Sequence, residues 1–225
     1  MLVLYSNPLS SPANKIRFLL HYLAIPYELK IVNIGAGEQQ QSDFLKINPY
    51  GKVPAIDDNG FRLAESNAIL RYLADKHHSS LYPKNLEERA FVEQWLDFAA
   101  NHISLAISKI MFNTYFYRLK GATKDERSLQ DGRLWLDNYL PMLEQQLVKQ
   151  AYIAGNSLTI ADFSLLAALD AVELVNINLA PYPYLKAWRQ NLMAQSFYQD
   201  CHSNYTAAFK AAVGTALDEA TNLTA

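Results

Sequence analysis

Apolar and polar positions alternate between strand-like and helix-like patterns over the first part of the chain. Residues 2–5 (LVLY) form a continuous apolar run, residues 14–24 repeat apolar side chains at helical spacing, and residues 27–34 (YELKIVNI) alternate as a half-buried strand does. A short helical pattern follows at 42–47. Residues 52–77 then predict a strand, a tight Asp-Asn-Gly turn, a second strand and an amphipathic helix. The predicted order is βαβ followed by ββα.

The pattern changes after a polar stretch at 78–88 that contains Pro83. Strand-like alternation stops there, and the apolar residues recur at helical spacing, first at Phe91, Trp95, Phe98 and Leu105 and then at Leu129, Leu136, Leu140, Leu143 and Leu147. We therefore expect an α/β domain at 1–78, a linker at 79–86 and an all-helical domain at 87–225.

Three local features refine the helical part. Pro141 lies inside the second long helical pattern and is expected to kink or break it. Thr159 and Asp162 stand at the spacing of a capping box, with Asp in place of the preferred Glu, and indicate the start of a further helix. The small, polar tail from Gly214 is expected to fray.

The composition excludes several classes of function but does not indicate a specific one. The 225 residues include 20 Lys and Arg against 22 Asp and Glu, so the charge balance indicates neither a nucleic-acid nor a membrane partner. No leader-like segment and no apolar run of bilayer length is present, so we expect a soluble, cytoplasmic protein. A single cysteine, Cys201, excludes an intrachain disulfide and the usual thiolate metal sites, and we expect it to be a half-buried thiol. No metal is expected.

Two short motifs have both a structural and a ligand-binding interpretation. Pro54 precedes a strand; if the Val53-Pro54 bond is cis, the N–H and C=O of Val53 are free to meet the peptide groups of a ligand, whereas a trans edge proline is the commoner case. Glu65 and Ser66 lie where a strand leads into a helix. Ser66 is either an N-cap alone or an N-cap that also receives an anion, and Glu65 beside it suits an ammonium group.

Four segments together resemble the cytosolic glutathione transferases: YSNPLSSPANKIRFLL, NPYGKVPAI, LAESNAILRYLADKH and LTIADFSLLAAL, in this order. The resemblance covers the chain from Met1 to about Phe209 and is closest to the serine-type theta, delta and phi classes. It implies a thioredoxin-like βαβββα domain followed by an all-helical domain, glutathione as co-substrate, a small electrophile as second substrate, and a homodimer. It also implies that the Val53-Pro54 bond is cis.

The same resemblance assigns the two serines after the first strand. Counting along the family pattern gives Ser10 as the hydroxyl that activates glutathione, with Ser11 next to it and Lys15 as the accompanying basic residue. Tyr5 is instead expected to be a core or strand-end ring, because it lies inside an apolar strand. Both serines can alternatively be plain helix-start residues.

Further residues follow for the two substrates. Glu65, Ser66 and Val53-Pro54 are expected to bind glutathione. Gln39 occupies a place where theta enzymes often carry a histidine toward the glycine end of glutathione, and Lys52 is a candidate for the same carboxylate.

The electrophile is expected against the aromatic and aliphatic segment 102–120, with Ile107 and Met111 as lining and Tyr115 as a pocket hydroxyl. The leading interpretation is a glutathione transferase, with peroxidase activity as an addition. The alternatives are a non-catalytic glutathione-binding scaffold and a dedicated glutathione-dependent isomerase or lyase.

Overall fold

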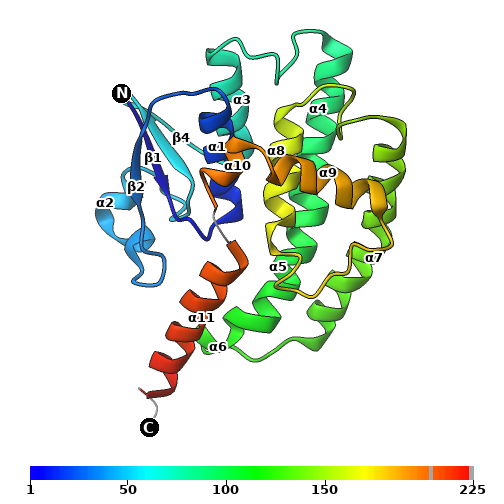
Figure 1. Ribbon diagram of the computed structural model, residues 1–225. Coiled ribbons are helices and arrows are strands. Elements are labelled where there is room, and N and C mark those ends of the chain that lie inside the picture. Colours follow the sequence, from blue (N-terminus) through cyan, green and yellow to red (C-terminus); the bar gives the residue numbers. More distant parts are fainter. Residues whose placement is uncertain (203–204, 223–225) are drawn as a thin grey trace.

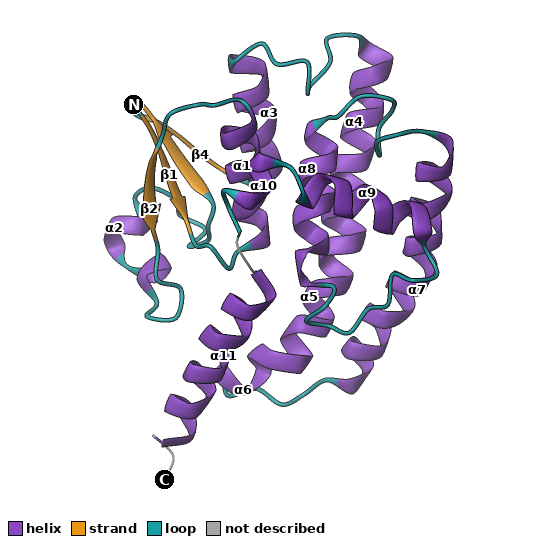
Figure 2. Ribbon diagram, in the orientation of Figure 1, coloured by secondary structure: helices purple, strands orange, loops and turns teal. Residues whose placement is uncertain are grey.

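The computed structural model describes residues 1–202 and 205–222, with side chains to Gly214. A four-stranded sheet forms the N-terminal part (Figures 1 and 2). Its strands lie in the order β2-β1-β3-β4; β2 runs parallel to β1, and β3 and β4 are antiparallel to their neighbours. The strand bounds are Leu2–Ser6 for β1, Glu28–Ile31 for β2, Ala55–Asp58 for β3 and Phe61–Ala64 for β4. The predicted α/β pattern is present.

Three helices and a three-residue 3₁₀ turn complete this part. The helices are α1 (Ser11–Tyr22), α2 (Ser42–Leu45) and α3 (Ser66–Lys76), and a 3₁₀ turn spans Glu38–Gln40. Figure 1 shows α1 and α3 between the sheet and the helical half, with α2 on the far side of the sheet. Asn59 and Gly60 join β3 to β4 with φ of 53° and 93°, the left-handed backbone that a tight hairpin requires.

The remainder of the chain is helical. Its elements are α4 (Leu86–Phe98), a π-helical segment (Ala99–Ser104), α5 (Leu105–Met111), a second π-helical segment (Phe112–Phe116), α6 (Tyr117–Leu119), α7 (Glu126–Lys149), α8 (Ile160–Ala168), a 3₁₀ turn (Leu169–Ala171), α9 (Pro183–Met193), α10 (Ser196–Gln199) and α11 (Tyr205–Asn222). The fold class predicted from the sequence is confirmed.

Helix α8 is the centre of this half, and every one of its residues is buried. A helix that is apolar on all sides must be surrounded, and α8 packs against α1, α4 and the first π-helical segment.

The predicted capping box holds the start of α8: Asp162 accepts hydrogen bonds from the N–H and the hydroxyl of Thr159 at 2.9 and 3.0 Å. The same carboxylate accepts from the N–H of Ile153 at 2.9 Å and from Trp188 Nε1 at 3.0 Å. Burial raises the pKa of Asp162 to about 6.

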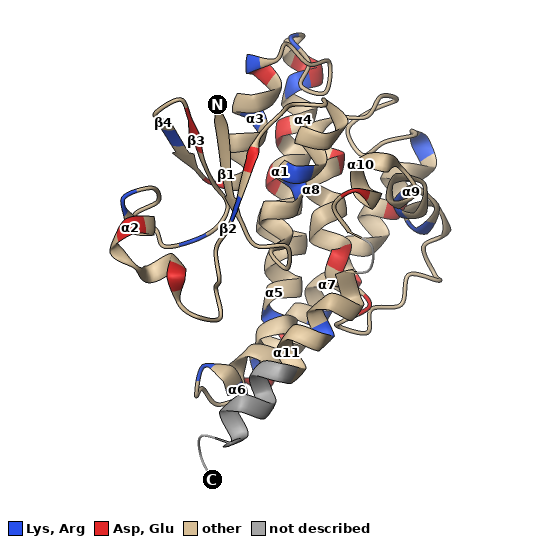
Figure 3. Cartoon of the chain, turned by 60° about the vertical axis from the view of Figure 1, so that its left-hand side comes forward, with Lys and Arg blue, Asp and Glu red and all other residues tan. Residues whose placement is uncertain are grey.

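Helix α7 runs from Glu126 to Lys149 with Pro141 inside it, so of the two expected effects of the proline, a break is wrong. The backbone is helical from Gly214 to Asn222, and residues 223–225 lie outside the described part, so fraying of the tail stays a prediction. Acidic and basic residues are distributed over both halves of the chain (Figure 3). Among the helices described, none is long and apolar enough to cross a bilayer.

Candidate active site

Strand pairing brings three of the predicted motifs to the same end of the sheet, where β1 and β4 end and β3 begins. The registers pair Tyr5 with Ala55 and Ala55 with Ala64. Three segments therefore lie at this end of the sheet: the loop at 7–10, the Val53-Pro54 bond and the Glu65-Ser66 turn.

Ser10 lies at the start of α1 with its hydroxyl free. It is the N-cap residue by backbone conformation, and its carbonyl oxygen accepts from the N–H groups of Ala13 and Asn14, each at 2.9 Å. Its side chain makes no capping hydrogen bond and, within the described part of the chain, has no other polar partner. A serine whose only role were capping would accept from the first helical turn, so this hydroxyl is available to a ligand.

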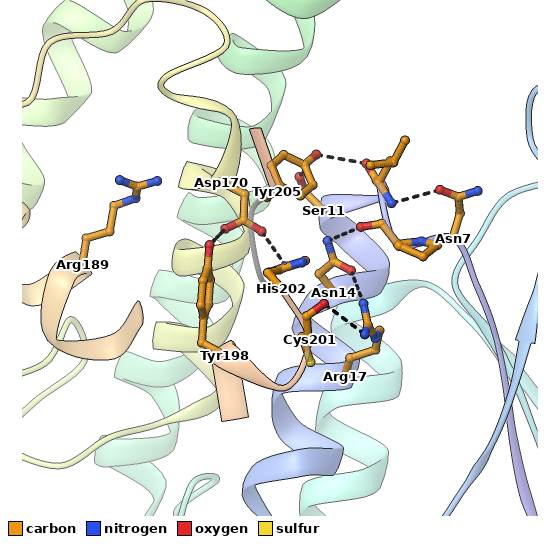
Figure 4. Close-up of polar contacts among 12 residues, drawn as sticks. Asn7, Ser11, Asn14, Arg17, Asp170, Arg189, Tyr198, Cys201, His202 and Tyr205 are labelled. Carbon is orange, nitrogen blue, oxygen red and sulfur yellow. Dashed lines mark hydrogen bonds and ion pairs between the residues drawn. The ribbon is translucent and has the colours of Figure 1, made fainter. Parts of the chain in front are cut away.

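The hydroxyl of Ser11 is in a different position, because it lies 3.3 Å from the hydroxyl of Tyr205 at the start of α11 (Figure 4). Tyr205 Oη also lies 3.0 Å from the carbonyl oxygen of Leu9, which can only accept. The single phenolic proton is therefore donated to Leu9, and the hydrogen bond between the hydroxyls must use the proton of Ser11. Burial raises the pKa of Tyr205 to about 12, so this phenol keeps its proton at neutral pH. Sequence reasoning left Ser10 and Ser11 separable only by counting, and this contact distinguishes them.

A buried polar cluster fixes Tyr205 in place (Figure 4). Tyr198 donates to Asp170 Oδ1 at 2.8 Å, and His202 Nε2 lies 3.4 Å from Asp170 Oδ2. The ring of His202 packs edge-on against that of Tyr205, with centroids 5.4 Å apart. The cluster therefore ties the start of α11 to the end of α8. Sequence analysis singled out neither Tyr205 nor this cluster.

A cavity of about 420 Å³ opens beside the two serines. Leu9, Ser10, Ser11 and Pro12 form one wall, residues of α5 and the second π-helical segment form another, and Tyr205 and Phe209 of α11 close it. Most of its surface is apolar, and its size is that of pockets for small organic ligands. We call it the interdomain cavity, since its walls come from both halves of the chain.

The three predicted pocket residues have different positions. Ile107 and Met111 line the interdomain cavity. Tyr115 is not among its lining residues: its hydroxyl donates to the carbonyl oxygen of Leu174 at 2.9 Å, and its ring packs edge-on against Phe209. The hydroxyl of Tyr115 is therefore satisfied within the protein. The ring of His102 packs between those of Phe98 and Tyr139, with centroids 4.9 Å from each.

The Val53-Pro54 bond is cis. Within residues 1–202 and 205–222, no turn or loop hydrogen bond uses the backbone of Val53. Glu65, not Ser66, is the N-cap residue of α3, and it holds a φ of 65°, a left-handed backbone that is uncommon for a residue with a side chain. Such conformations collect at ligand sites, where surrounding structure imposes them. Ser66 becomes the first residue of the helix, and its N–H is one of the unpaired donors of that turn.

Gln39 and Lys52 lie on two loops that touch at Gly51. A side chain at Gly51 would stand 2.6 Å from Gln40 Nε2 and 3.1 Å from the carbonyl oxygen of Gln39, so only glycine permits this approach, and its φ is 61°. The side-chain oxygen of Gln39 is buried without a hydrogen-bond partner among the described residues. Lys52 is exposed. Gln39 and Lys52 are therefore carried by two segments that approach each other at Gly51, and among the described residues no hydrogen bond or ion pair of the Lys52 ammonium group is found.

Lys15 does not line the cavity but lies buried between α1, α3 and α8. Its Nζ donates to Asn67 Oδ1 at 2.5 Å and to Ser164 Oγ at 3.2 Å. Burial, followed by the charge of Arg71, lowers the pKa of Lys15 to about 7. Sequence reasoning expected a basic residue accompanying Ser10; the structure shows an amine that joins the two halves of the chain beneath the Glu65-Ser66 turn.

Further groups that can carry chemistry are the free cysteine and the acidic and histidine side chains. Cys201 is a free, half-buried thiol in the turn after α10, and burial raises its pKa to about 12. Across the described side chains, no set of three His, Cys, Asp or Glu residues is arranged to hold a metal ion.

Comparison with known proteins agrees with this geometry. Two family models match, "Glutathione S-transferase, N-terminal domain" over residues 1–75 and "Glutathione S-transferase, C-terminal domain" over residues 83–196. Glutathione S-transferase 1 of Zea mays is 33% identical over 177 residues, which is 77% of this chain and 82% of the maize protein.

Solved structures give the same result. Human glutathione transferase theta-2, in complex with glutathione and an unknown ligand, superposes with a TM-score of 0.87 at 28% identity, covering 96% of this chain and 91% of that one. A delta-class glutathione transferase of Nilaparvata lugens superposes with a TM-score of 0.83 at 30% identity, covering 96% and 100%. The resemblance inferred from four short segments is confirmed, and the chain belongs to the glutathione S-transferase family.

Proposed function

We propose that this enzyme activates glutathione as a thiolate and transfers it to small, mostly apolar electrophiles, with Ser10 as the donor to the sulfur. The observation that carries the proposal is the unpartnered Ser10 hydroxyl at the mouth of an apolar cavity. Ser11 is adjacent, but its proton is used by Tyr205. We therefore assign Ser11 to holding the loop and Ser10 to the chemistry.

One hydrogen bond from a hydroxyl is strong enough to lower the pKa of the glutathione thiol by the amount that catalysis requires. A thiol of ordinary pKa, about 8.5, is mostly protonated at neutral pH. Lowering that pKa by about two units requires roughly 2.7 kcal/mol of preferential stabilisation of the thiolate. A hydrogen bond to a charged group contributes about 1.5 to 3 kcal/mol. Ser10, helped by the unpaired N–H of Ser11 at the start of α1, is sufficient without a covalent intermediate.

The other proposed glutathione contacts are made by residues at the same end of the sheet and by two residues of the neighbouring segments. Glu65 and the N-terminal turn of α3 at Ser66 offer a carboxylate and free N–H groups for the ammonium and carboxylate of an amino-acid head group. Val53, held by the cis bond to Pro54, offers its backbone to a peptide group. Gln39 and Lys52 are assigned to the glycine end, where an amide and a cation face an anion.

The test is an ultraviolet titration of glutathione bound to the protein, compared with free glutathione. We expect the bound thiol to ionise at least one pH unit below the free thiol, the Ser10→Ala variant to abolish most of that shift, and Ser11→Ala to keep most of it. A bound thiol with an unshifted pKa in the wild type would overturn the proposal in favour of a binding scaffold. A full shift with poor turnover of generic electrophiles would instead indicate a dedicated isomerase or lyase.

We also propose a homodimer and a cytoplasmic location. The dimer is supported by half-exposed aromatic side chains, Phe61 on the outermost strand β4 and Phe91 on α4, which a partner copy could cover. Sedimentation velocity tests it: a single species of the monomer mass at micromolar concentration would contradict the dimer. Peroxidase activity and the domain division at 79–86 stay predictions.

A further inference from the structure

Lys15 lies beside the first turn of α3, next to the proposed site of the glutathione head group. It is only 6% exposed, and its Nζ donates to Asn67 Oδ1 at 2.5 Å, where Asn67 is the residue after Ser66. Lys15 also follows the N-cap residue Ser10 by five positions on α1, a rise of about 7.5 Å along the helix axis. The amine is therefore buried between the two segments that are proposed to hold the head group and the sulfur.

The hydrogen bonds around Lys15 match a neutral amine. Ser164 donates its single hydroxyl proton to Asn67 Oδ1 at 3.2 Å, so toward Lys15, at 3.2 Å, it can only accept. The amide of Asn67 donates to the carbonyl oxygen of Leu96 at 3.1 Å, which fixes its oxygen toward Lys15. Two acceptors thus meet the two N–H groups of a neutral amine. An ammonium ion has a third N–H, for which the described part of the chain offers no acceptor.

The charged groups near Lys15 do not supply a counter-ion in direct contact. Helix α3 carries Arg71, whose charge adds to burial in lowering the pKa of Lys15, and Glu65, which acts in the opposite direction. On α4, the carboxylates of Glu93 and Asp97 face Arg71, at 2.9 Å from its Nε and 3.8 Å from its Nη2. Helix α8 contributes a hydroxyl and, among the described residues, no charged group. The ionisation of this amine therefore responds to a charge that arrives nearby.

Glutathione brings negative charge to this place. It has two carboxylates and one ammonium group, and the bound thiolate adds a further negative charge. A negative charge near a buried amine favours the protonated form. The proposed contact of the glutathione ammonium group with Glu65 works against this effect, but the net charge of the ligand stays negative. Binding should therefore shift Lys15 toward the ammonium form.

We propose that Lys15 takes up a proton when glutathione binds, so that a buried positive charge appears near the thiolate only in the complex. This inference rests on the proposed function. The S–H bond of the thiol breaks, its electron pair stays on sulfur and its proton goes to water. The lone pair of Lys15 Nζ takes a proton from water, so the two exchanges balance in charge. The free protein avoids burying a full charge, while the complex gains a cation that stabilises the bound anion.

The test counts protons by isothermal titration calorimetry in buffers of different ionisation enthalpy. The probe is S-methylglutathione, which keeps both carboxylates but has no thiol proton to release. With a pKa of about 7 in the free protein, roughly a tenth of Lys15 is charged at pH 8. A rise of one pH unit on binding then gives an uptake of roughly 0.4 proton per site at pH 8 and less than about 0.1 at pH 6, where Lys15 is already charged. We expect this pair of values for the wild type.

Two substitutions remove the exchangeable proton in opposite ways. Lys15→Met has no charge, whereas Lys15→Arg keeps a permanent one. Each should reduce the uptake at pH 8 to less than about 0.1 proton. The wild type should also lose roughly five- to tenfold in affinity for the probe between pH 6.5 and pH 9, and Lys15→Arg less than twofold. Lys186→Met, at an exposed lysine of α9, is the matched control and should keep the wild-type uptake.

The outcomes separate this inference from the proposed function. A wild type that binds neither glutathione nor S-methylglutathione would overturn the proposed function itself. Binding without proton uptake in the wild type, or an uptake that both Lys15 variants retain, would overturn only the role of Lys15. If Lys15→Met does not fold, Lys15→Arg decides, because it keeps a cation and its N–H donors. If neither variant folds, the difference in wild-type uptake between pH 6 and pH 8 decides.

Discussion

Ser11 and Tyr205 join their hydroxyls at 3.3 Å across 194 positions of the chain. The contact places the first turn of α11 directly on the serine loop. A second hydrogen bond, from Tyr205 to the carbonyl oxygen of Leu9, joins the same two segments. The C-terminal helix therefore closes the cavity and also orients the loop that carries Ser10. Activity should depend on this helix although none of its residues touches the sulfur in our proposal.

Replacing Tyr205 by Phe tests that dependence. The ring and its packing stay, while the bonds to Ser11 and Leu9 are lost, so we expect the loop to loosen and the thiolate shift of bound glutathione to shrink. Loss of two neutral hydrogen bonds should also cost about 1 to 2 kcal/mol of unfolding free energy. Ultraviolet titration and thermal unfolding measure the two effects. A wild-type thiol pKa in the variant would show that the loop is held by other contacts.

Sequence patterns predicted most of the fold because strands, turns and helix caps depend mainly on interactions between residues that are close in the sequence. The apolar run at β1, the tight turn at Asn59 and Gly60, and the Thr159–Asp162 capping box each depend on residues that are near one another in sequence. Of the kink or break expected at Pro141, the break does not occur, because a proline inside a long helix removes only one hydrogen bond while tertiary packing of Leu136, Leu140 and Leu143 keeps the helix continuous.

The site was less accessible from sequence because its decisive contacts are long-range. Tyr205 determines that the Ser11 hydroxyl is hydrogen-bonded within the protein while the Ser10 hydroxyl is not, and no local signal around Tyr205 indicates a partner near residue 11. The same holds for Tyr115, whose hydroxyl is used by Leu174. Lys15 was visible as a helix-one cation, but its burial against Ser164 required the docking of α8 on α1.

A second prediction concerns Gly132, where α7 crosses α5. A Cβ there would stand 2.8 Å from the carbonyl oxygen of Ala106 and 2.9 Å from Ile110 Cγ1. Because backbone cannot yield as a side-chain tip can, Gly132→Ala should destabilise the protein by about 1 to 3 kcal/mol in urea unfolding. Gly214→Ala is the control: a Cβ there meets nothing within 4 Å, so helix propensity alone should leave stability unchanged or slightly higher. Equal stability of the two variants would contradict the close crossing.

A third prediction concerns Asp162, which is buried and accepts hydrogen bonds from Thr159, Ile153 and Trp188. Asp162→Ala would leave these donors unpaired in the core, so we expect a loss of roughly 3 to 5 kcal/mol. Asp125 caps α7 at the surface with a single bond to the N–H of Ser128 at 2.9 Å, and Asp125→Ala should cost only about 1 kcal/mol. Thermal unfolding of the pair measures the contrast, and comparable losses would show that the Asp162 network adds nothing beyond capping.

The buried amine of Lys15 gives the fourth prediction, a dependence of stability on pH. Its pKa is about 7 in the folded protein against 10.5 for the unfolded chain. Between these values the unfolded chain binds a proton that the folded protein does not, so the free energy of unfolding should rise with pH by up to roughly 1 kcal/mol per pH unit. Below pH 7 both states are protonated, and the full cost of burying the charge remains.

The Lys15→Met variant isolates this contribution, because other titrating groups act equally in both proteins and cancel in the difference. Methionine also loses the bonds to Asn67 and Ser164, but that loss does not vary with pH. We expect the stability of the wild type relative to Lys15→Met to increase by on the order of 2 kcal/mol between pH 6.5 and pH 9, in urea titrations at each pH. Lys186→Met, which changes an exposed lysine of α9, should show a constant difference over the same range. A constant difference for Lys15→Met as well would mean that Lys15 stays charged when buried, and that Asn67 and Ser164 with neighbouring groups solvate the ammonium ion as well as water does.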